Sequence, residues 1–169
     1  MPLNLLKKYN ALLELNGLTE QQRRTSLWGV FSRDFINQNT VYFNTKKIVP
    51  TPLDGKVTME TLFNHLTTRM IDKDNRSREF DIERANRLHW VRFHLLCSNP
   101  EVLLIFSVNE PHGIRTYIYD KEQYYVIVLE PLRKKDEYYL LTAYKLTGKD
   151  LKRNKILAKY NNRRLPELL

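Results

Sequence analysis

The residues best suited to acid–base and phosphate chemistry lie in two stretches of the chain. In DIERANRLHWVRFHLLC, residues His89 and Arg92 are three positions apart, so they are neighbours if the stretch is helical. In YYLLTAYKL, residues Thr142 and Tyr144 are two positions apart, so they share one face of a strand. Histidine exchanges protons near neutral pH, arginine grips phosphate, and hydroxyls donate hydrogen bonds. These are the groups that phosphodiester cleavage without a metal requires, if the fold brings them into one cleft.

The helical period of residues 81–97 determines where two of these side chains point. With Asp81 as N-cap, the apolar side chains form one broad arc, and both His89 and Arg92 fall inside it. A cation that is turned towards the interior needs a partner or a cleft. The pair therefore either lines a site or consists of a core histidine and an arginine that meets a carboxylate, and both interpretations stay open.

The elements that must position these residues predict an α+β domain. Helical periods give way to alternating ones after residue 100, and the third of the late strands is apolar on both faces. We expect N-terminal helices followed by an antiparallel four-stranded sheet with helices packed on one face. We expect helices at 3–15, 19–36, 59–71 and 81–97, the second of which begins with a Thr19–Gln22 capping box. We expect short strands within 41–49 and longer strands at 101–108, 115–120, 123–130 and 138–146.

A polar connection at 72–79 is the expected boundary between two regions. Residues 1–80 are interpreted as a helical accessory region, and residues 81–169 as the nuclease-like core with a basic C-terminal tail. The 169-residue chain carries a net charge of +9, and residues 145–169 hold eight lysines or arginines against two acids. This balance favours a nucleic-acid partner, although a solvated tail is the simpler alternative. The residues expected to bind substrate are Arg87, Arg115, Lys145, Lys149, Lys152 and Arg153.

Several signatures are missing from the sequence. It has no Walker loop, GxGxxG, GxSxG, CxxC or HExxH motif, and its carboxylates form no set suited to two metal ions. We therefore expect no cofactor and no metal. A single cysteine, Cys97, fits a reducing compartment, and no apolar stretch reaches the length of a membrane span. The expected location is the cytoplasm, with delivery into a target cell as an alternative, and no membrane partner.

The order of these parts resembles the superfamily of small metal-independent ribonucleases that includes barnase, EndoU, colicin D and the RelE-like toxins (the BECR fold). It most resembles the phage-associated and polymorphic-toxin branch. The residues that carry the resemblance are RLHW at 87–90, YVIVL at 125–129 and YYLLTAY at 138–144. It covers about residues 81–150, whereas residues 1–80 match nothing in the family.

The resemblance implies a toxin-like endoribonuclease that cleaves RNA, possibly tRNA or another structured RNA, by 2′-hydroxyl transesterification. By this analogy His89 matches the family's histidine, Arg87 or Arg92 the nearby basic residue, and Thr142 with Tyr144 the pair on the last strand. An acidic immunity or antitoxin protein is the implied partner. His112, in the turn NEPHGI, is an alternative proton-transfer residue, and His65 is interpreted as a surface or supporting residue.

Two other functions remain open at this point. The first is a nucleic-acid-binding module without catalysis, which explains the charge equally well. The second is a phage or structural interaction protein whose basic tail binds an acidic partner. The toxin members are usually C-terminal pieces of long delivery proteins, whereas this chain is short, so the resemblance leaves both alternatives in place.

Overall fold

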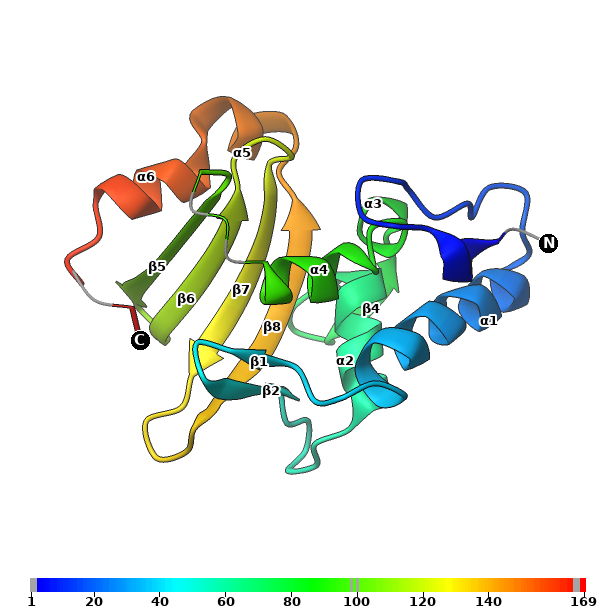
Figure 1. Cartoon of the computed structure of the whole chain (residues 1–169), viewed down its shortest axis with the longest axis horizontal. Coiled ribbons are helices and arrows are strands. Elements are labelled where there is room, and N and C mark those ends of the chain that lie inside the picture. The colour runs from blue at the N-terminus through cyan, green and yellow to red at the C-terminus, as the bar shows by residue number, and fades with distance from the viewer. Residues whose placement is uncertain (1–2, 98, 100, 166–167) are drawn as a thin grey trace.

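A computed structural model describes residues 3–97, 99, 101–165 and 168–169, which form a curled sheet with helices on both faces (Figure 1). A small separate hairpin lies beside it. The elements in chain order are η1 (Asn4–Leu6), α1 (Glu20–Phe31), η2 (Ser32–Ile36), β1 (Tyr42–Phe43), β2 (Lys46–Pro50), α2 (Met59–Thr67), β3 (Thr68–Asp72), β4 (Ser77–Phe80), α3 (Ile82–Ala85), α4 (Trp90–Leu96), β5 (Leu103–Glu110), β6 (Gly113–Asp120), β7 (Tyr125–Pro131), β8 (Glu137–Lys145), α5 (Gly148–Arg153) and α6 (Lys155–Asn161).

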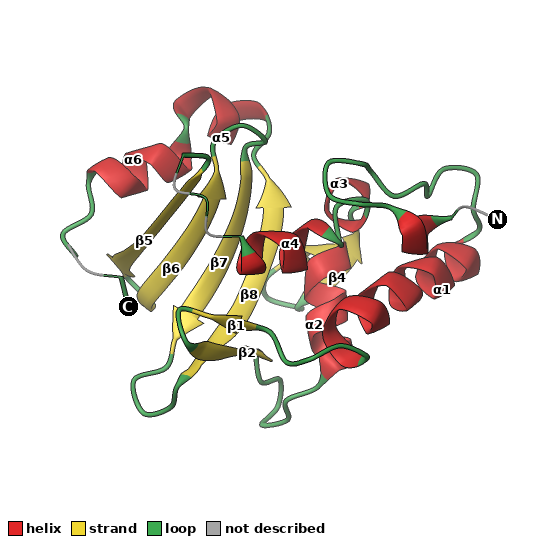
Figure 2. Cartoon of the chain, in the orientation of Figure 1, coloured by secondary structure: helices red, strands yellow, loops and turns green. Residues whose placement is uncertain are grey.

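The main sheet has six strands in the order β1-β2-β8-β7-β6-β5 (Figure 2). Strands β5 to β8 pair antiparallel with their neighbours, whereas β2 runs parallel to the first half of β8, with Ile48 opposite Tyr138. The prediction of a four-stranded antiparallel sheet is therefore wrong. The four late strands exist, but the backbone groups along the outer edge of β8 find partners in a strand from the N-terminal half.

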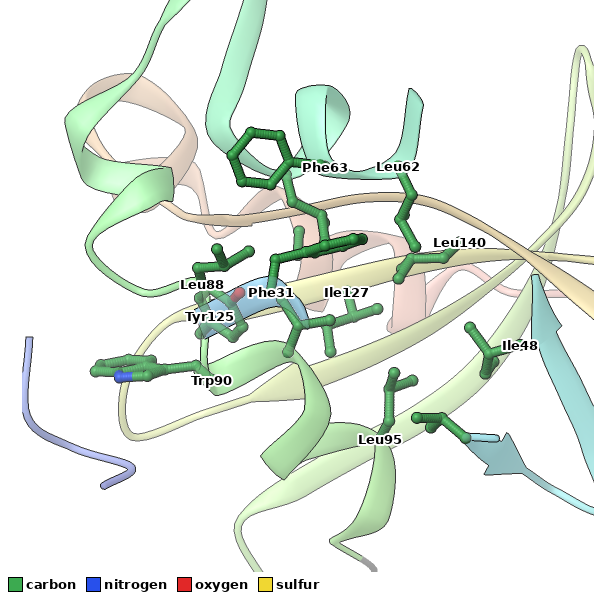
Figure 3. Close-up of a cluster of buried hydrophobic side chains, with 14 of the residues drawn as sticks. Phe31, Ile48, Leu62, Phe63, Leu88, Trp90, Leu95, Tyr125, Ile127 and Leu140 are labelled. Atoms are coloured by element: carbon green, nitrogen blue, oxygen red, sulfur yellow. The ribbon is translucent and has the colours of Figure 1, made fainter. Parts of the chain in front are cut away.

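Side chains alternate between two faces of this sheet. One face, here called the helix face, carries Ile118, Ile127 and Leu129 and packs in one cluster with side chains of α1, α2 and α4 (Figure 3). The opposite face, here called the tail face, carries Tyr119 and Val126 and packs against α5 and α6. The prediction that helices pack on only one face of the sheet is therefore also wrong. The basic tail covers the second face because its apolar side chains Leu151, Ile156 and Tyr160 pack there.

A β-bulge divides β8 into two halves. The pairing of β7 with β8 passes from Leu129–Leu140 to Val128–Thr142, so Leu141 is an extra residue. Beyond it, Thr142 and Tyr144 lie opposite Val128 and Val126 and therefore point towards the tail face.

The predicted helix at 81–97 is broken into α3 and α4 by a turn at 86–89. Asp81 caps α3 as expected, because its side chain accepts a hydrogen bond from the backbone of Arg84. The carbonyl of Asn86, however, accepts from the backbone N–H of Leu13 at 2.9 Å. An N-terminal segment thus takes the acceptor that would have continued the helix.

Two further helices differ from the prediction. Residues 3–15 form only the short turn η1, because the Asn4 side chain bonds to both backbone groups of Glu14 and closes a loop. Helix α2 ends at Thr67, and residues 68–80 form the hairpin β3–β4, in which Arg69 pairs with Glu79. The Thr19–Gln22 capping box of α1 is confirmed.

Residues 1–80 contribute to the same core as residues 81–169. Leu27, Phe31 and Leu62 belong to one buried cluster with Leu88 and Leu129. None of the helices in the described part of the chain is long and apolar enough to cross a membrane.

Candidate functional site

The structure places His89 on the helix face, just before α4. Its side chain is buried, and Nε2 lies 3.1 Å from the backbone carbonyl oxygen of Lys8. Burial lowers the pKa of His89, although the carbonyls of Lys8 and Ala11 act in the opposite direction. His89 thus ties the N-terminal segment to α4.

Arg92 is also engaged on the helix side. Its Nη1 donates to the backbone carbonyl oxygen of Asp34 at 2.7 Å and approaches that of Asn39 at 3.5 Å. The four residues predicted to be catalytic therefore do not converge on one cleft. His89 and Arg92 bind backbone of the N-terminal half, while Thr142 and Tyr144 lie on the tail face.

Another arginine meets Thr142 and Tyr144. Arg84 Nη1 donates to Thr142 Oγ1 at 3.0 Å, and the guanidinium carbon of Arg84 lies 5.5 Å from the centre of the Tyr144 ring. The Asp81 cap starts α3 directly after the hairpin, so Arg84 lies in the first turn beside β8. The strand pair predicted from the sequence is therefore joined by a helix-borne arginine other than Arg87 or Arg92.

A second arginine approaches the first at the carbonyl oxygen of Thr68. This oxygen accepts from Arg84 Nη1 at 3.2 Å and from Arg78 Nη2 at 3.0 Å, while Arg78 Nε donates to Thr68 Oγ1 at 2.7 Å. The hairpin causes this contact, because it pairs Met70 with Arg78 and returns the chain over the start of β3. Two guanidinium groups are thereby held around one oxygen atom.

This pair of cations has little counter-charge. Asp81 Oδ2 lies 3.5 Å from Arg84 Nε, and within the described residues Arg78 has no ion-pair partner. Burial lowers the pKa of Arg84, and burial followed by the charge of Arg84 lowers the pKa of Arg78. Both groups stay protonated, because guanidinium does not lose its proton in proteins. An anion placed here would relieve the cost of holding two half-buried like charges together.

His65 lies near the end of α2, three residues before Thr68. Burial lowers its pKa, and the charges of Arg78 and Arg84 lower it further. Burial raises the pKa of Tyr144, so the phenol keeps its proton. The group held together by direct contacts is here called the arginine site, and its members are Thr68, Arg78, Arg84, Thr142 and Tyr144.

Sequence reasoning missed Arg78 because it assigned 72–79 to a connection. It missed Arg84 because it took Arg87 or Arg92 as the basic residue of the predicted helix 81–97. Only the hairpin brings Arg78 back over Thr68. A signal was present in the stretch SREFDIER at 77–84, where Arg78 and Arg84 stand on either side of the capping residue Asp81. Whether these two arginines lie close together depends on the turn that the chain makes at Asp81.

The expected substrate-binding residues divide into three groups. Arg87 is buried and is held by Glu83 Oε2 at 2.8 Å, with its guanidinium over Trp90. Arg115 Nη1 lies 3.5 Å from Glu130 Oε1 in an ion pair. The remaining four follow Tyr144 along the chain: Lys145 is half-buried, whereas Lys149, Lys152 and Arg153 are exposed on α5.

Searches of protein families, curated proteins and solved structures find no match to this chain. In the described ranges, no group of three or more histidine, cysteine, aspartate or glutamate side chains is arranged to hold a metal ion. The chemistry of the arginine site itself is that of an anion-binding site, because it combines two guanidinium groups with three hydroxyls.

Proposed function

We propose that the chain binds RNA through the arginine site and cleaves it there, as a metal-independent endoribonuclease that uses the substrate's own 2′-hydroxyl as nucleophile. The observation that carries the proposal is the approach of Arg78 and Arg84 to one carbonyl oxygen, at 3.0 and 3.2 Å, with Asp81 as the neighbouring carboxylate. Two cations held together by the fold are suited to a phosphodiester.

The free donors of both arginines support this role. In the described part of the chain, Nη2 of Arg84 and Nη1 of Arg78 have no hydrogen-bond partner, and neither atom is enclosed. Arg84 Nη1 is held by Thr142 and Thr68, and Arg78 Nε and Nη2 are held by Thr68, so both guanidinium groups are oriented before a ligand arrives. Preorganised donors of this kind stabilise the charge that grows on phosphate oxygens in the transition state.

Further exposed cations follow Tyr144 along the chain. Helix α5 begins three residues after Lys145, and its Lys149, Lys152 and Arg153 are exposed. We propose that these cations contact phosphates next to the one that is cleaved.

The test is incubation of the purified chain with end-labelled RNA in EDTA, with analysis of the product ends. We expect fragments with 2′,3′-cyclic phosphate and 5′-hydroxyl ends. Replacing Arg84 by Ala should reduce the rate by about 100-fold or more, the usual loss for one transition-state donor. Arg24→Ala, which changes an exposed arginine paired with Glu60, is the matched control and should leave the rate unchanged.

Two outcomes would contradict the proposal. RNA that is bound but stays intact would make the chain a nucleic-acid-binding module without catalysis. RNA that is neither bound nor cut, or a rate that is equally unaffected by Arg84→Ala and Arg24→Ala, would remove the arginine site from the function.

A further inference from the structure

We propose that Phe80 stacks on an unpaired base of the RNA that the arginine site binds, so that the site accepts single-stranded RNA in preference to duplex RNA. This inference rests on the proposed function and names the form of its substrate. It starts from the hairpin β3–β4, in which Phe80 lies directly opposite Thr68. The side-chain and backbone oxygens of Thr68 hold Arg78 and Arg84.

The register of the hairpin places Phe80 and Arg78 on one face. Opposite residues of an antiparallel pair project to the same side, as do residues two apart in a strand. Phe80 is opposite Thr68 and Arg78 is opposite Met70, so these four side chains share a face. The β-carbons of Phe80 and Thr68 are therefore about 5 Å apart by ordinary cross-strand spacing. The ring of Phe80 thus starts next to the residue that holds both arginines.

The Phe80 ring is supported on one side and open in part. The guanidinium carbon of Arg23, on α1, lies 4.5 Å from the centre of this ring. A cation over an aromatic face is attracted to it and holds the ring in position. Phe80 is nevertheless 36% exposed. The ring therefore keeps surface on which a flat ligand can stack.

The other exposed aromatic side chains in the described part of the chain do not belong to the hairpin. They are Trp28 on α1, Tyr42 on β1, Phe93 on α4 and Tyr124 just before β7. Tyr144, the aromatic residue within the arginine site, is half-buried under Arg84. Phe80 thus combines an exposed ring with a place beside the two arginines.

Cations and an exposed ring together suit an unpaired nucleotide. Proteins that bind single strands combine positive charges along the phosphates with aromatic side chains on which the bases stack. In a duplex the bases are already paired and stacked on one another, so they offer no free face to Phe80. Every base has such a face when it is unpaired, so Phe80 would select single strands without selecting a sequence.

The experiment measures the binding of three fluorescein-labelled probes at one salt concentration by fluorescence anisotropy. The first is a single-stranded 2′-O-methyl RNA decamer, which lacks the nucleophilic hydroxyl and stays intact. The second is this decamer paired with its complement, and the third is a decamer of abasic tetrahydrofuran phosphates. The unaltered chain should bind the first probe more tightly than the duplex and about 5- to 100-fold more tightly than the abasic decamer, because these are the losses expected for one stacked base.

Three variants assign this difference to Phe80. Phe80→Leu should weaken binding of the single strand by about 5- to 100-fold and leave binding of the other two probes within about 2-fold. Phe80→Trp keeps a ring that can stack and should retain the affinity for the single strand. Tyr42→Leu removes an exposed ring on β1 and is the matched control, which should change none of the three affinities. Circular dichroism shows whether each variant is folded.

The outcomes separate this inference from the proposed function. Equal binding of the RNA and abasic decamers by the unaltered chain would overturn the role of Phe80 without the use of any variant. An equal loss for all three probes in Phe80→Leu would overturn it as well and would mean that Phe80 only packs the hairpin against α1. A chain that cleaves unmodified RNA through Arg84 but shows no dependence on bases keeps the proposed function and loses this inference. A chain that binds as expected but does not cleave keeps the stacking role and loses the catalytic one, and a chain that binds no probe loses both.

Discussion

Replacing His89 by Ala should destabilise the fold and leave the chemistry of the folded molecules unchanged. His89 is 5% exposed, and its Nε2 lies 3.1 Å from the Lys8 carbonyl oxygen. It belongs to the contacts that hold the N-terminal segment on α4, together with the bond from Trp90 Nε1 to Ala11. The substitution removes the imidazole ring of His89 and its hydrogen bond to the Lys8 carbonyl oxygen.

The expected loss can be worked out from three contributions. The hydrogen bond accounts for about 1 kcal/mol, because Lys8 is exposed and its carbonyl can bond to water instead. Emptying a well-packed site of this size costs about 2–3 kcal/mol. Removing the enclosed Nδ1, which has no partner in the described part of the chain, returns about 1 kcal/mol. The net decrease in the free energy of unfolding is therefore about 2–3 kcal/mol.

Urea unfolding followed by circular dichroism measures this decrease and avoids a fluorescence signal from the adjacent Trp90. With a slope of about 2 kcal/mol per molar urea, the midpoint should fall by about 1–1.5 M. The control His112→Ala, in an exposed turn, should leave the midpoint unchanged. RNA cleavage per folded molecule should stay within about 2-fold for both. An unchanged midpoint together with lost cleavage would refute this reasoning and place His89 in the active site.

Two further predictions concern acid stability and charge. Burial raises the pKa of Asp120, but hydrogen bonds from His94, the Gln123 backbone and Tyr9 outweigh it and leave this pKa below 3.8. The ionised Asp120 therefore stabilises the fold above about pH 4, and this stabilisation is lost as the pH falls further. Asp120→Asn should lower the urea midpoint at pH 6. Between pH 6 and pH 2.5 the midpoint of this variant should fall less than that of the unaltered chain. Changing Lys149, Lys152 and Arg153 to Gln should reduce the slope of log Kd for RNA against log salt concentration. The expected reduction is about 0.7–0.9 for each phosphate that these side chains neutralise, with no change in circular dichroism. An unchanged slope would mean that these residues serve solubility and do not contact RNA.

Local sequence determined those features whose partners lie within a few residues. The Thr19–Gln22 capping box predicts the start of α1, and Asp81 predicts the cap of α3, because both bonds close within one helical turn. Alternation predicts the strands β5 to β8. It also predicts that Thr142 and Tyr144 share a face, which they do, because the bulge at Leu141 precedes both residues.

Tertiary structure alone decided the features that depend on distant partners. A continuous helix over 81–97 predicts one buried apolar arc, but Phe93 and Leu96 are exposed and His94 is buried. The Leu13–Asn86 hydrogen bond breaks the helix, and His89 bonds to the N-terminal segment. The parallel pairing of β2 with β8 also joins two segments that are far apart in the sequence. Arg78 reaches Arg84 only because a hairpin returns over Thr68. Periodicity indicates the type of an element, whereas the burial of each side chain and the partner of each buried polar group depend on the whole chain. The candidate site consists of contacts of this second kind.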